Sequence, residues 1–279
     1  MHNPTKRPLM VDVNKHNQRS WDKKSAAGES PWVQPVTPGE IAAARSGDWQ
    51  VILTPTKSVP RSWFGDLKNK TLLGLASGGG QQIPIFSAAG AVVTSFDQSS
   101  EQLNKDAQVA QREGLAIECI QGDMADLSVF DDASFDIIFH PVSNIFAADI
   151  RPVWQHCARI LRPGGRLLSG FMNPDFYLFD HWAIEDGGPL EVRFKLPYAD
   201  LTHVDPATLE ARMAQGEALE FSHSLDEQIG GQLAAGLVVA GFYEDRWSEE
   251  ATPLNSYMPT SMATLAIKPA VGSELMPDV

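Results

Sequence analysis

Cysteine is scarce in this sequence: only Cys119 and Cys157 occur among 279 residues, and neither has a CxxC partner. A disulfide scaffold and a zinc site are therefore not expected. The histidines and carboxylates show no metal-ligand spacing, so no metal cofactor is expected either. Cys157 falls within a predicted helix, where a cysteine usually packs as a small apolar side chain.

Positive charge is also in short supply. Lysine and arginine number 22 against 35 acidic residues, which gives a formal net charge of −13. Proteins that bind phosphate backbones cluster Lys and Arg, so a nucleic-acid partner is not expected. No apolar run reaches the roughly 18 residues of a membrane span, and the N-terminus is polar. We therefore expect a cytoplasmic protein with no membrane partner, either a monomer or a homodimer.

The first 69 residues contain many prolines and no clear apolar period. Only one helix is predicted there, over 38–45, with Thr37 as its N-cap and Pro38 in its first turn. We interpret residues 1–69 as an arm that packs on a domain formed by residues 70–270. Residues 271–279 are interpreted as a flexible tail.

From Lys70 onward, predicted strands and helices alternate, which favours an α/β fold with a mostly parallel sheet covered on both faces. The predicted strands cover 71–75, 91–96, 117–121, 135–139, 166–171, 242–247 and 262–268. The predicted helices cover 82–89, 99–114, 150–161 and 224–240. Residues 173–219 interrupt this rhythm as a long insertion with a predicted strand over 190–196 and a helix over 206–215. Such insertions are usually lids or binding elements.

A glycine-rich turn follows the first predicted strand and opens a helix, in the run Ala76-Ser77-Gly78-Gly79-Gly80-Gln81. Glycines allow tight turns and the close approach of a ligand, although such turns also bind phosphates, dinucleotides or nothing. Asp97 ends the second strand about 20 residues later, where a carboxylate can accept both hydroxyls of a ribose. Asp123 ends the third strand, and we expect it to take an adenine amino group with Met124 against the ring. Ile83 stands where a dinucleotide fold usually has its third glycine, which disfavours a nicotinamide oxidoreductase.

These pieces resemble the class I methyltransferases that use S-adenosylmethionine (SAM), in particular the small-molecule branch that includes the ubiquinone-biosynthesis type. The resemblance covers residues 70–171 closely and the last two predicted strands loosely. The matching pieces occur in the family's order: the loop 75–80, Asp97, Gly122-Asp123-Met124, the strand Phe135-Asp136-Ile137-Ile138-Phe139 and the turn Leu161-Arg162-Pro163-Gly164-Gly165. The resemblance implies a Rossmann-like, seven-stranded sheet, SAM as the methyl donor and S-adenosylhomocysteine (SAH) as its product.

The resemblance also implies which residues bind SAM. They are Ala76, Ser77, Gly78, Gly80 and Gln81 at the methionine part, Asp97 and Gln98 at the ribose, Gly122, Asp123 and Met124 at adenine, and His140 at the sulfonium end. The sequence departs from the family twice, because Gly74 replaces the usual acidic residue and Ala76 replaces the first loop glycine. A contact to the SAM ammonium group is therefore expected from Gln81, Gln82 or the arm.

Three residues are candidates for catalysis. His140 follows the fourth predicted strand, where this fold meets both cofactor and acceptor, and it is either a general base or a hydrogen-bonding wall. Asn144 is expected to be a turn residue or a residue that orients the reacting groups. His16 lies in an arm segment that could close over the site. Aromatic residues of the insertion are expected either to close the site or to pack in a core. They are Phe176, Tyr177, Phe179, His181 and Trp182.

The methyl acceptor is predicted to be a small molecule, and the reaction is predicted to be direct in-line transfer. Because no dedicated base stands out, the leading hypothesis is S-methylation of a small thiol or sulfide, whose pKa of about 8.5 allows ionisation near neutrality. O- or N-methylation of a quinone-like molecule or an amine is the rival. A SAM-binding protein without catalysis is a further alternative.

Overall fold

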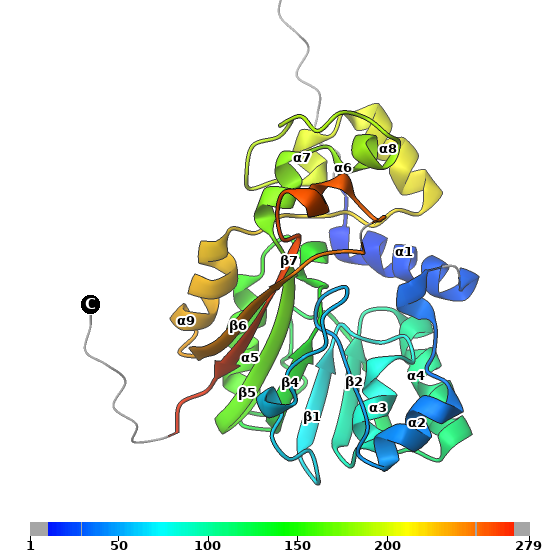
Figure 1. Cartoon of the computed structure of the whole chain (residues 1–279), viewed down its shortest axis with the longest axis vertical. Coiled ribbons are helices and arrows are strands. Elements are labelled where there is room, and N and C mark those ends of the chain that lie inside the picture. Colours follow the sequence, from blue (N-terminus) through cyan, green and yellow to red (C-terminus); the bar gives the residue numbers. More distant parts are fainter. Residues whose placement is uncertain (1–10, 29, 249, 271–279) are drawn as a thin grey trace, which may run out of the picture.

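A seven-stranded sheet runs through the centre of the protein, in the order β3-β2-β1-β4-β5-β7-β6 (Figure 1). The computed structural model describes residues 11–28, 30–248 and 250–270. β7 is antiparallel to both of its neighbours, and all pairs among β1 to β5 are parallel. The predicted seven-stranded, mostly parallel sheet is therefore confirmed. Its strands are β1 (Thr71–Leu75), β2 (Val92–Asp97), β3 (Ile117–Gln121), β4 (Phe135–His140), β5 (Leu161–Met172), β6 (Val238–Asp245) and β7 (Ser261–Ile267).

Successive residues of the central strands point to opposite faces of the sheet, and each face has its own apolar core. Leu72 and Ile137 pack in a cluster with α2 (Pro38–Arg45), α3 (Gln82–Ala88) and α4 (Ser100–Glu113). Leu73 and Ile138, one residue further along, pack on the other face. There they meet α5 (Arg151–Ile160), which in turn contacts α9 (Gly231–Ala234). Helices thus cover both faces, as the alternating sequence pattern predicts.

Helix α2 has the predicted N-cap. The Thr37 hydroxyl accepts from the Glu40 backbone amide, and the Glu40 carboxylate accepts from the Thr37 amide, which completes a capping box. Helix α4 also matches closely, with Ser99 as its N-cap and Gly114 as its C-cap at a φ of +64°. Local capping chemistry therefore places these helix ends well.

The arm was predicted to hold a single helix, and this was wrong. Helix α1 (Val13–Ala27) begins with Asp12 as its N-cap and ends at Gly28, whose φ is +68°. It packs beside α4 and reaches the insertion (Figure 1). The buried residues of α1 are polar, namely Asn17, Ser20 and Ser25, so the helix lacks the apolar stripe that usually reveals one.

The insertion lies over the carboxyl ends of the strands, at the top of Figure 1. It contains a short 3-10 helix (Pro174–Leu178), α6 (His181–Glu185), α7 (Asp200–His203) and α8 (Pro206–Gln215), of which only α8 was predicted. The strand predicted over 190–196 is absent: only Val192 forms a bridge, with Phe179. Two small apolar clusters hold this region together, one around Tyr177 and one around Leu209.

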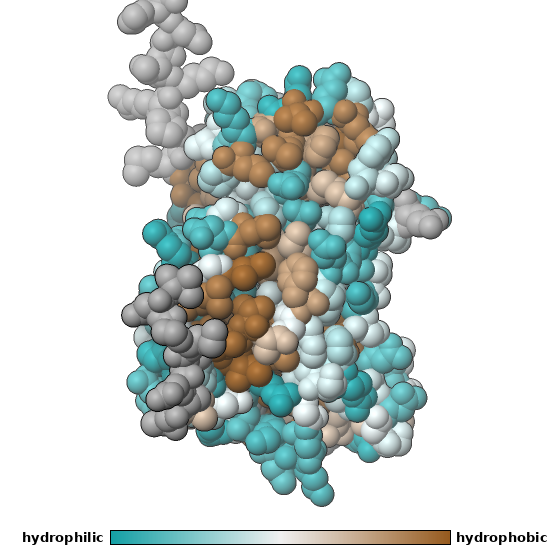
Figure 2. All heavy atoms as spheres, turned by 60° about the vertical axis from the view of Figure 1, so that its left-hand side comes forward, coloured by the Kyte–Doolittle hydropathy of each residue, from teal (hydrophilic) through white to brown (hydrophobic). Residues whose placement is uncertain are grey.

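The predicted helix over 224–240 was wrong in its second half. A short π-helix (Asp226–Gly230) and α9 are followed by Gly236 at a φ of +86°, and β6 already begins at Val238. Apolar side chains are exposed on this side of the molecule, where Figure 2 shows a hydrophobic area; Leu233, Val238 and Phe242 are among them. Helix α5 ends at Ile160, one residue before β5 begins. Residues 271–279, predicted to be a flexible tail, lie outside the described residues, and no helix of the described part is long and apolar enough to cross a membrane.

Candidate active site

The glycine-rich turn between β1 and α3 lies at the carboxyl edge of the sheet, where the strand order reverses beside β1. Two carboxylates hold its amides: Gly78 N donates to Asp97 Oδ2 at 3.1 Å, and Gly80 N donates to Asp106 Oδ1 at 2.7 Å. Ala76 has a φ of +48°, a left-handed conformation that disfavours a Cβ. The turn is therefore fixed by the next βα unit and carries local backbone strain.

The Ile83 side chain packs directly against the backbone of Gly74. A Cβ on Gly74 would lie 2.0 Å from Ile83 Cδ1, and the Ile83 side chain is fully buried. The isoleucine thus fills the space that a side chain at position 74 would need. An acidic side chain at position 74, as in the methyltransferase pattern, would therefore require Ile83 to change.

Asp97 is 8% exposed at the end of β2. Its Oδ1 accepts from Ser99 N at 2.9 Å and its Oδ2 accepts from Gly78 N. Burial raises the pKa of Asp97 to about 6, against the partial opposing effect of these amides. Asp106 behind it is fully buried, and burial raises its pKa to about 7. Asp97 keeps lone pairs free toward the cavity beside it, so it is able to accept hydroxyl donors there.

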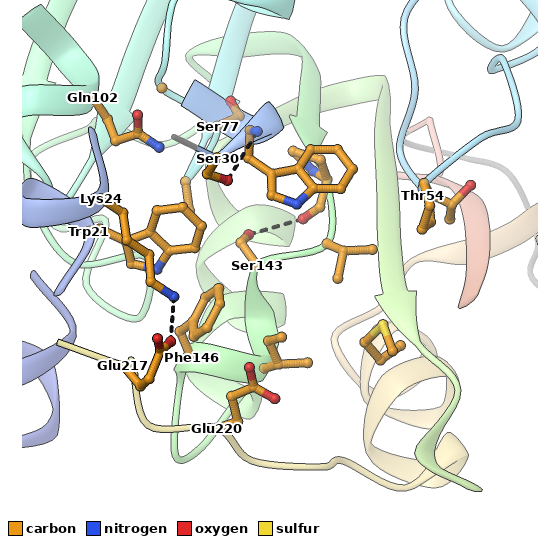
Figure 3. A pocket seen from close by; sticks show the side chains of 18 of the residues that line it. Trp21, Lys24, Ser30, Thr54, Ser77, Gln102, Ser143, Phe146, Glu217 and Glu220 are labelled. Atoms are coloured by element: carbon orange, nitrogen blue, oxygen red, sulfur yellow. Dashed lines mark hydrogen bonds and ion pairs between the residues drawn. The ribbon is translucent and has the colours of Figure 1, made fainter. Parts of the chain in front are cut away.

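A cavity of about 700 Å³ opens beside this turn. One side, here called the sheet wall, is formed by predicted SAM-binding residues: Ala76, Ser77, Gly78, Gln81, Asp97, Gln98 and Met124. The facing side, here called the outer wall, comes from α1 and from residues 176–220: Trp21, Lys24, Tyr177, His181, Glu185, Glu217 and Glu220. Figure 3 shows side chains from both walls directed into one space.

The other predicted SAM-binding residues do not line the cavity. Gly80 lies against Pro35, and Gly122 lies under the Phe96 ring, where a Cβ would approach Phe96 Cζ to 2.2 Å. Both glycines permit close packing. The Asp123 carboxylate accepts from the Asn14 side chain of α1 and from Ala125 N, so helix α1 covers this end of β3.

His140 and Asn144 are both fully buried and lie outside the cavity lining. The Leu75 carbonyl accepts from His140 Nδ1 at 3.0 Å, and burial lowers the His140 pKa to about 4. Asn144 Nδ2 donates to Gln228 Oε1 at 2.8 Å. Neither side chain lines the cavity, so the general-base role of His140 and the orienting role of Asn144 stay predictions. His140 Nε2 and Asn144 Oδ1 are both buried without a partner among the described residues.

His16 contacts another segment of the chain, and its expected catalytic role stays a prediction. Its Nε2 lies 2.8 Å from the Glu217 carbonyl, and the side chain does not line the cavity. The contact joins α1 to the segment after α8. Trp21 and Trp32 of the arm do line the cavity, and so do Phe176, Tyr177 and His181 of the insertion. Phe179 and Trp182 do not.

The carboxylates of the outer wall were missed by sequence reasoning. Glu217 and Glu220 follow α8 in a segment without a motif, and neither spacing nor periodicity marks them. Glu220 Oε2 accepts from the Tyr177 hydroxyl at 2.7 Å, and His181 Nε2 lies 3.9 Å away. Burial raises the pKa of Glu220, and burial raises that of Glu185 as well. Titratable groups therefore face the sheet wall across the cavity.

Among residues 11–28, 30–248 and 250–270, no group of three or more His, Cys, Asp or Glu side chains is arranged to hold a metal ion.

Comparisons with known proteins agree with this geometry. The methyltransferase domain family matches residues 73–169. An uncharacterized methyltransferase of Bacillus subtilis, YbaJ, is 45% identical over 91% of this chain and 97% of its own. A solved structure of a SAM-dependent methyltransferase from Listeria monocytogenes covers 82% of this chain and 99% of its own, with a TM-score of 0.59 at 16% identity.

A second solved structure covers 96% of this chain and 93% of its own, with a TM-score of 0.55 at 14% identity. It is a 1,6-didemethyltoxoflavin-N1-methyltransferase from Burkholderia thailandensis with 1,6-didemethyltoxoflavin and SAH bound. The fold, the order of the loop and strand-end residues, and the near full-length relative lead to one conclusion: this chain belongs to the class I SAM-dependent methyltransferases.

Proposed function

We propose that the cavity binds SAM on its sheet wall and a small-molecule methyl acceptor on its outer wall. The observation that carries this proposal is that both walls line one continuous space. In the proposed arrangement α1 and the insertion act together as a cover. The Burkholderia structure, with a small acceptor and SAH bound to a similar fold, supports this division.

The sheet wall has unmet hydrogen-bonding capacity that fits a polar cofactor. Ser77 and Gln102 line the cavity, and their side-chain atoms Ser77 Oγ and Gln102 Oε1 are buried without a partner among the described residues. Such atoms are costly unless a ligand or water satisfies them. We assign the methionine part of SAM to Ala76, Ser77, Gly78 and Gln81, the ribose to Asp97 and Gln98, and adenine to Met124 with Asp123 at its edge.

Bound SAM supplies an electrophilic methyl carbon. The chain's own residues would hold the acceptor in line with that carbon and exclude water. Aromatic side chains that line the cavity, including Trp21, Phe146 and Tyr177, provide an apolar surface for this.

The acceptor proposed here differs from the expected thiol or sulfide. That expectation rested on the lack of a base, and the outer wall offers Glu220 and His181. A nucleophile that must lose a proton, an amine or a hydroxyl, therefore fits this cavity better. The thiol hypothesis stays open to test with sulfide or methanethiol and SAM, by headspace gas chromatography. Volatile methyl sulfides above the no-enzyme control would favour it.

Calorimetry with SAM, SAH and NAD tests the cofactor assignment. We expect SAM and SAH to bind and NAD not to bind. Asp97→Ala should weaken SAH at least about tenfold, because hydrogen bonds to a charged group contribute about 1.5–3 kcal/mol. Binding of NAD without SAM, or an unchanged SAH affinity in Asp97→Ala, would overturn the proposal.

A further inference from the structure

Charge is unbalanced on the outer wall. Three carboxylates line it, those of Glu185, Glu217 and Glu220, and two lysines of α1 stand near them. Lys24 Nζ forms an ion pair with Glu217 at 2.8 Å, which Figure 3 shows as a dashed line. Lys23 Nζ donates to the Gln215 carbonyl. Within the described part of the chain, no lysine or arginine lies within 4.0 Å of Glu185 or Glu220.

Glu220 is held firmly in place. Its backbone amide donates to Asp200 Oδ2 at 2.8 Å, and its carbonyl accepts from Asp200 N at 3.1 Å. The Tyr177 hydroxyl holds Oε2, and no donor of the described residues contacts Oε1. Only 23% of the side chain is exposed. A mostly buried carboxylate with one free oxygen is expensive unless a ligand supplies the missing positive charge or donor.

Aromatic rings line the same cavity as this carboxylate. Trp21 and Phe146 pack edge to face with centroids 5.3 Å apart, and Tyr177 stacks on Tyr198 at 5.2 Å. Trp21, Phe146 and Tyr177 all line the cavity with Glu220. Aromatic faces attract cations, and a carboxylate in the same cavity attracts them further when it is ionised.

Anions and neutral molecules fit this wall less well. An anionic acceptor would meet Glu185 and Glu220, neither of which has a lysine or arginine of the described residues within 4.0 Å, and Lys24 already pairs with Glu217. Arg212 lies 4.0 Å from Asp180 and over the Trp182 ring. A neutral acceptor would leave the buried charge of Glu220 without compensation.

We propose that the outer wall recognises a cationic acceptor, an amine-bearing small molecule, with Glu220 as its counter-ion. This inference rests on the proposed methyltransferase function and makes its acceptor more specific. Methyl transfer then balances as follows: the ammonium group loses one proton, which passes through Glu220 to solvent. The nitrogen lone pair forms the N–CH3 bond while the S–CH3 bond of SAM breaks, and that electron pair stays on sulfur to give SAH.

Calorimetry with three ligands of matched size tests the charge preference. Benzylamine, benzyl alcohol and benzoate are titrated into the full chain, with and without saturating SAH. We expect benzylamine to bind at least about tenfold more tightly than benzyl alcohol, and benzoate to bind most weakly. Equal affinities, a preference for benzoate, or no benzylamine binding by protein that binds SAH would overturn the inference.

Variants of Glu220, Glu217 and Lys24 test which side chain is responsible for the preference for a cation. Glu220→Gln should remove most of the preference for benzylamine over benzyl alcohol. Glu217→Gln should change it less, because Lys24 already neutralises that carboxylate, and Lys24→Met should increase it. An unchanged preference in Glu220→Gln would overturn the role of that residue.

SAH affinity separates this inference from the function on which it rests. Each variant should keep SAH affinity within about threefold, since none of these residues is assigned to SAM. Loss of SAH binding by the unmodified chain would contradict the proposed function, whatever the three ligands show. Normal SAH binding without a charge preference would contradict only the cationic acceptor.

Discussion

The sheet wall and the outer wall of the cavity are held in different ways. Residues of the sheet wall come from 76 to 124 in the sequence and follow three neighbouring parallel strands. The outer wall joins α1 to a segment about 200 residues away in the chain. Asn17 makes this junction: its Nδ2 donates to the Leu219 carbonyl at 3.0 Å, and its Oδ1 accepts from Leu219 N at 2.7 Å. The comparison teaches that the sheet wall is part of the fold's core, whereas α1 is joined to the facing segment by buried polar contacts beside a small apolar cluster.

Replacing Asn17 should produce the largest effect. Asn17→Ala leaves three buried backbone partners unmet, because Nδ2 also donates to the Phe146 carbonyl, and should cost about 2–4 kcal/mol. We expect amide hydrogen exchange to accelerate in α1 and around Leu219, while β1 to β4 stay protected. Asn14→Ala on the same helix is the control, since Asn14 is exposed. Uniform acceleration across the sheet would contradict the distinction between the walls.

The Gly74–Ile83 contact tests the rigidity of the sheet wall. Gly74→Ala should destabilise the protein by about 1–3 kcal/mol, because its Cβ would collide with Ile83 Cδ1. Ile83→Val removes that methyl group, so the penalty of Gly74→Ala should shrink by at least about 0.5 kcal/mol in this background. Urea unfolding of the four proteins measures the coupling. Additive effects would show that the two positions are independent.

The pH dependence of SAH binding tests Asp97. Burial raises its folded pKa to about 6 from 3.8, so the folded protein holds more protons than the unfolded chain between these values. The contribution of Asp97 to stability therefore falls as pH rises through this window. Ribose hydroxyls donate to the ionised carboxylate, so SAH affinity should rise about tenfold from pH 5 to pH 7.

Two other acids face Asp97, namely Asp22 of α1 and Asp106 of α4. Asp97→Asn should flatten the pH profile of SAH affinity, whereas a profile that persists in this variant would assign the titration to one of these neighbours. A falling affinity in the unmodified protein would contradict the ribose contact itself. Calorimetry at constant ionic strength gives the profile.

The smallest effect is expected at Ala76. Ala76→Gly relieves the left-handed strain at φ +48° but gives the unfolded chain more freedom, so the net gain should be below about 1 kcal/mol. Thermal unfolding measures it, and Ala76→Val is the opposite control, since a larger side chain keeps the strain and narrows the cavity. A marked loss of stability in Ala76→Gly would mean that the packing contacts of the Ala76 Cβ stabilise the protein by more than its left-handed conformation costs.

Much of this protein was predictable from short stretches of sequence. Caps such as Thr37 and Ser99 placed helix ends, and the glycine-rich turn with Asp97 and Met124 marked one wall of the cavity. These signals act between residues close in the chain, so they leave a spacing that can be read. Two helical regions were not predicted correctly. Helix α1 buries polar side chains, so it shows no apolar period. The helix before β6 is interrupted by a π-helical turn and by Gly236, which break the usual helical period.

The sequence by itself determined the family, the sheet and the residues expected along its carboxyl edge. Only the tertiary structure decided what faces that edge. The Lys24–Glu217 ion pair and the Asn17–Leu219 contact join residues about 200 positions apart, and such polar contacts leave no motif or period in the sequence. The tertiary structure also moved His140 behind the wall, because the Leu75 carbonyl holds its ring inside the core. The charge that the acceptor meets therefore follows from long-range packing.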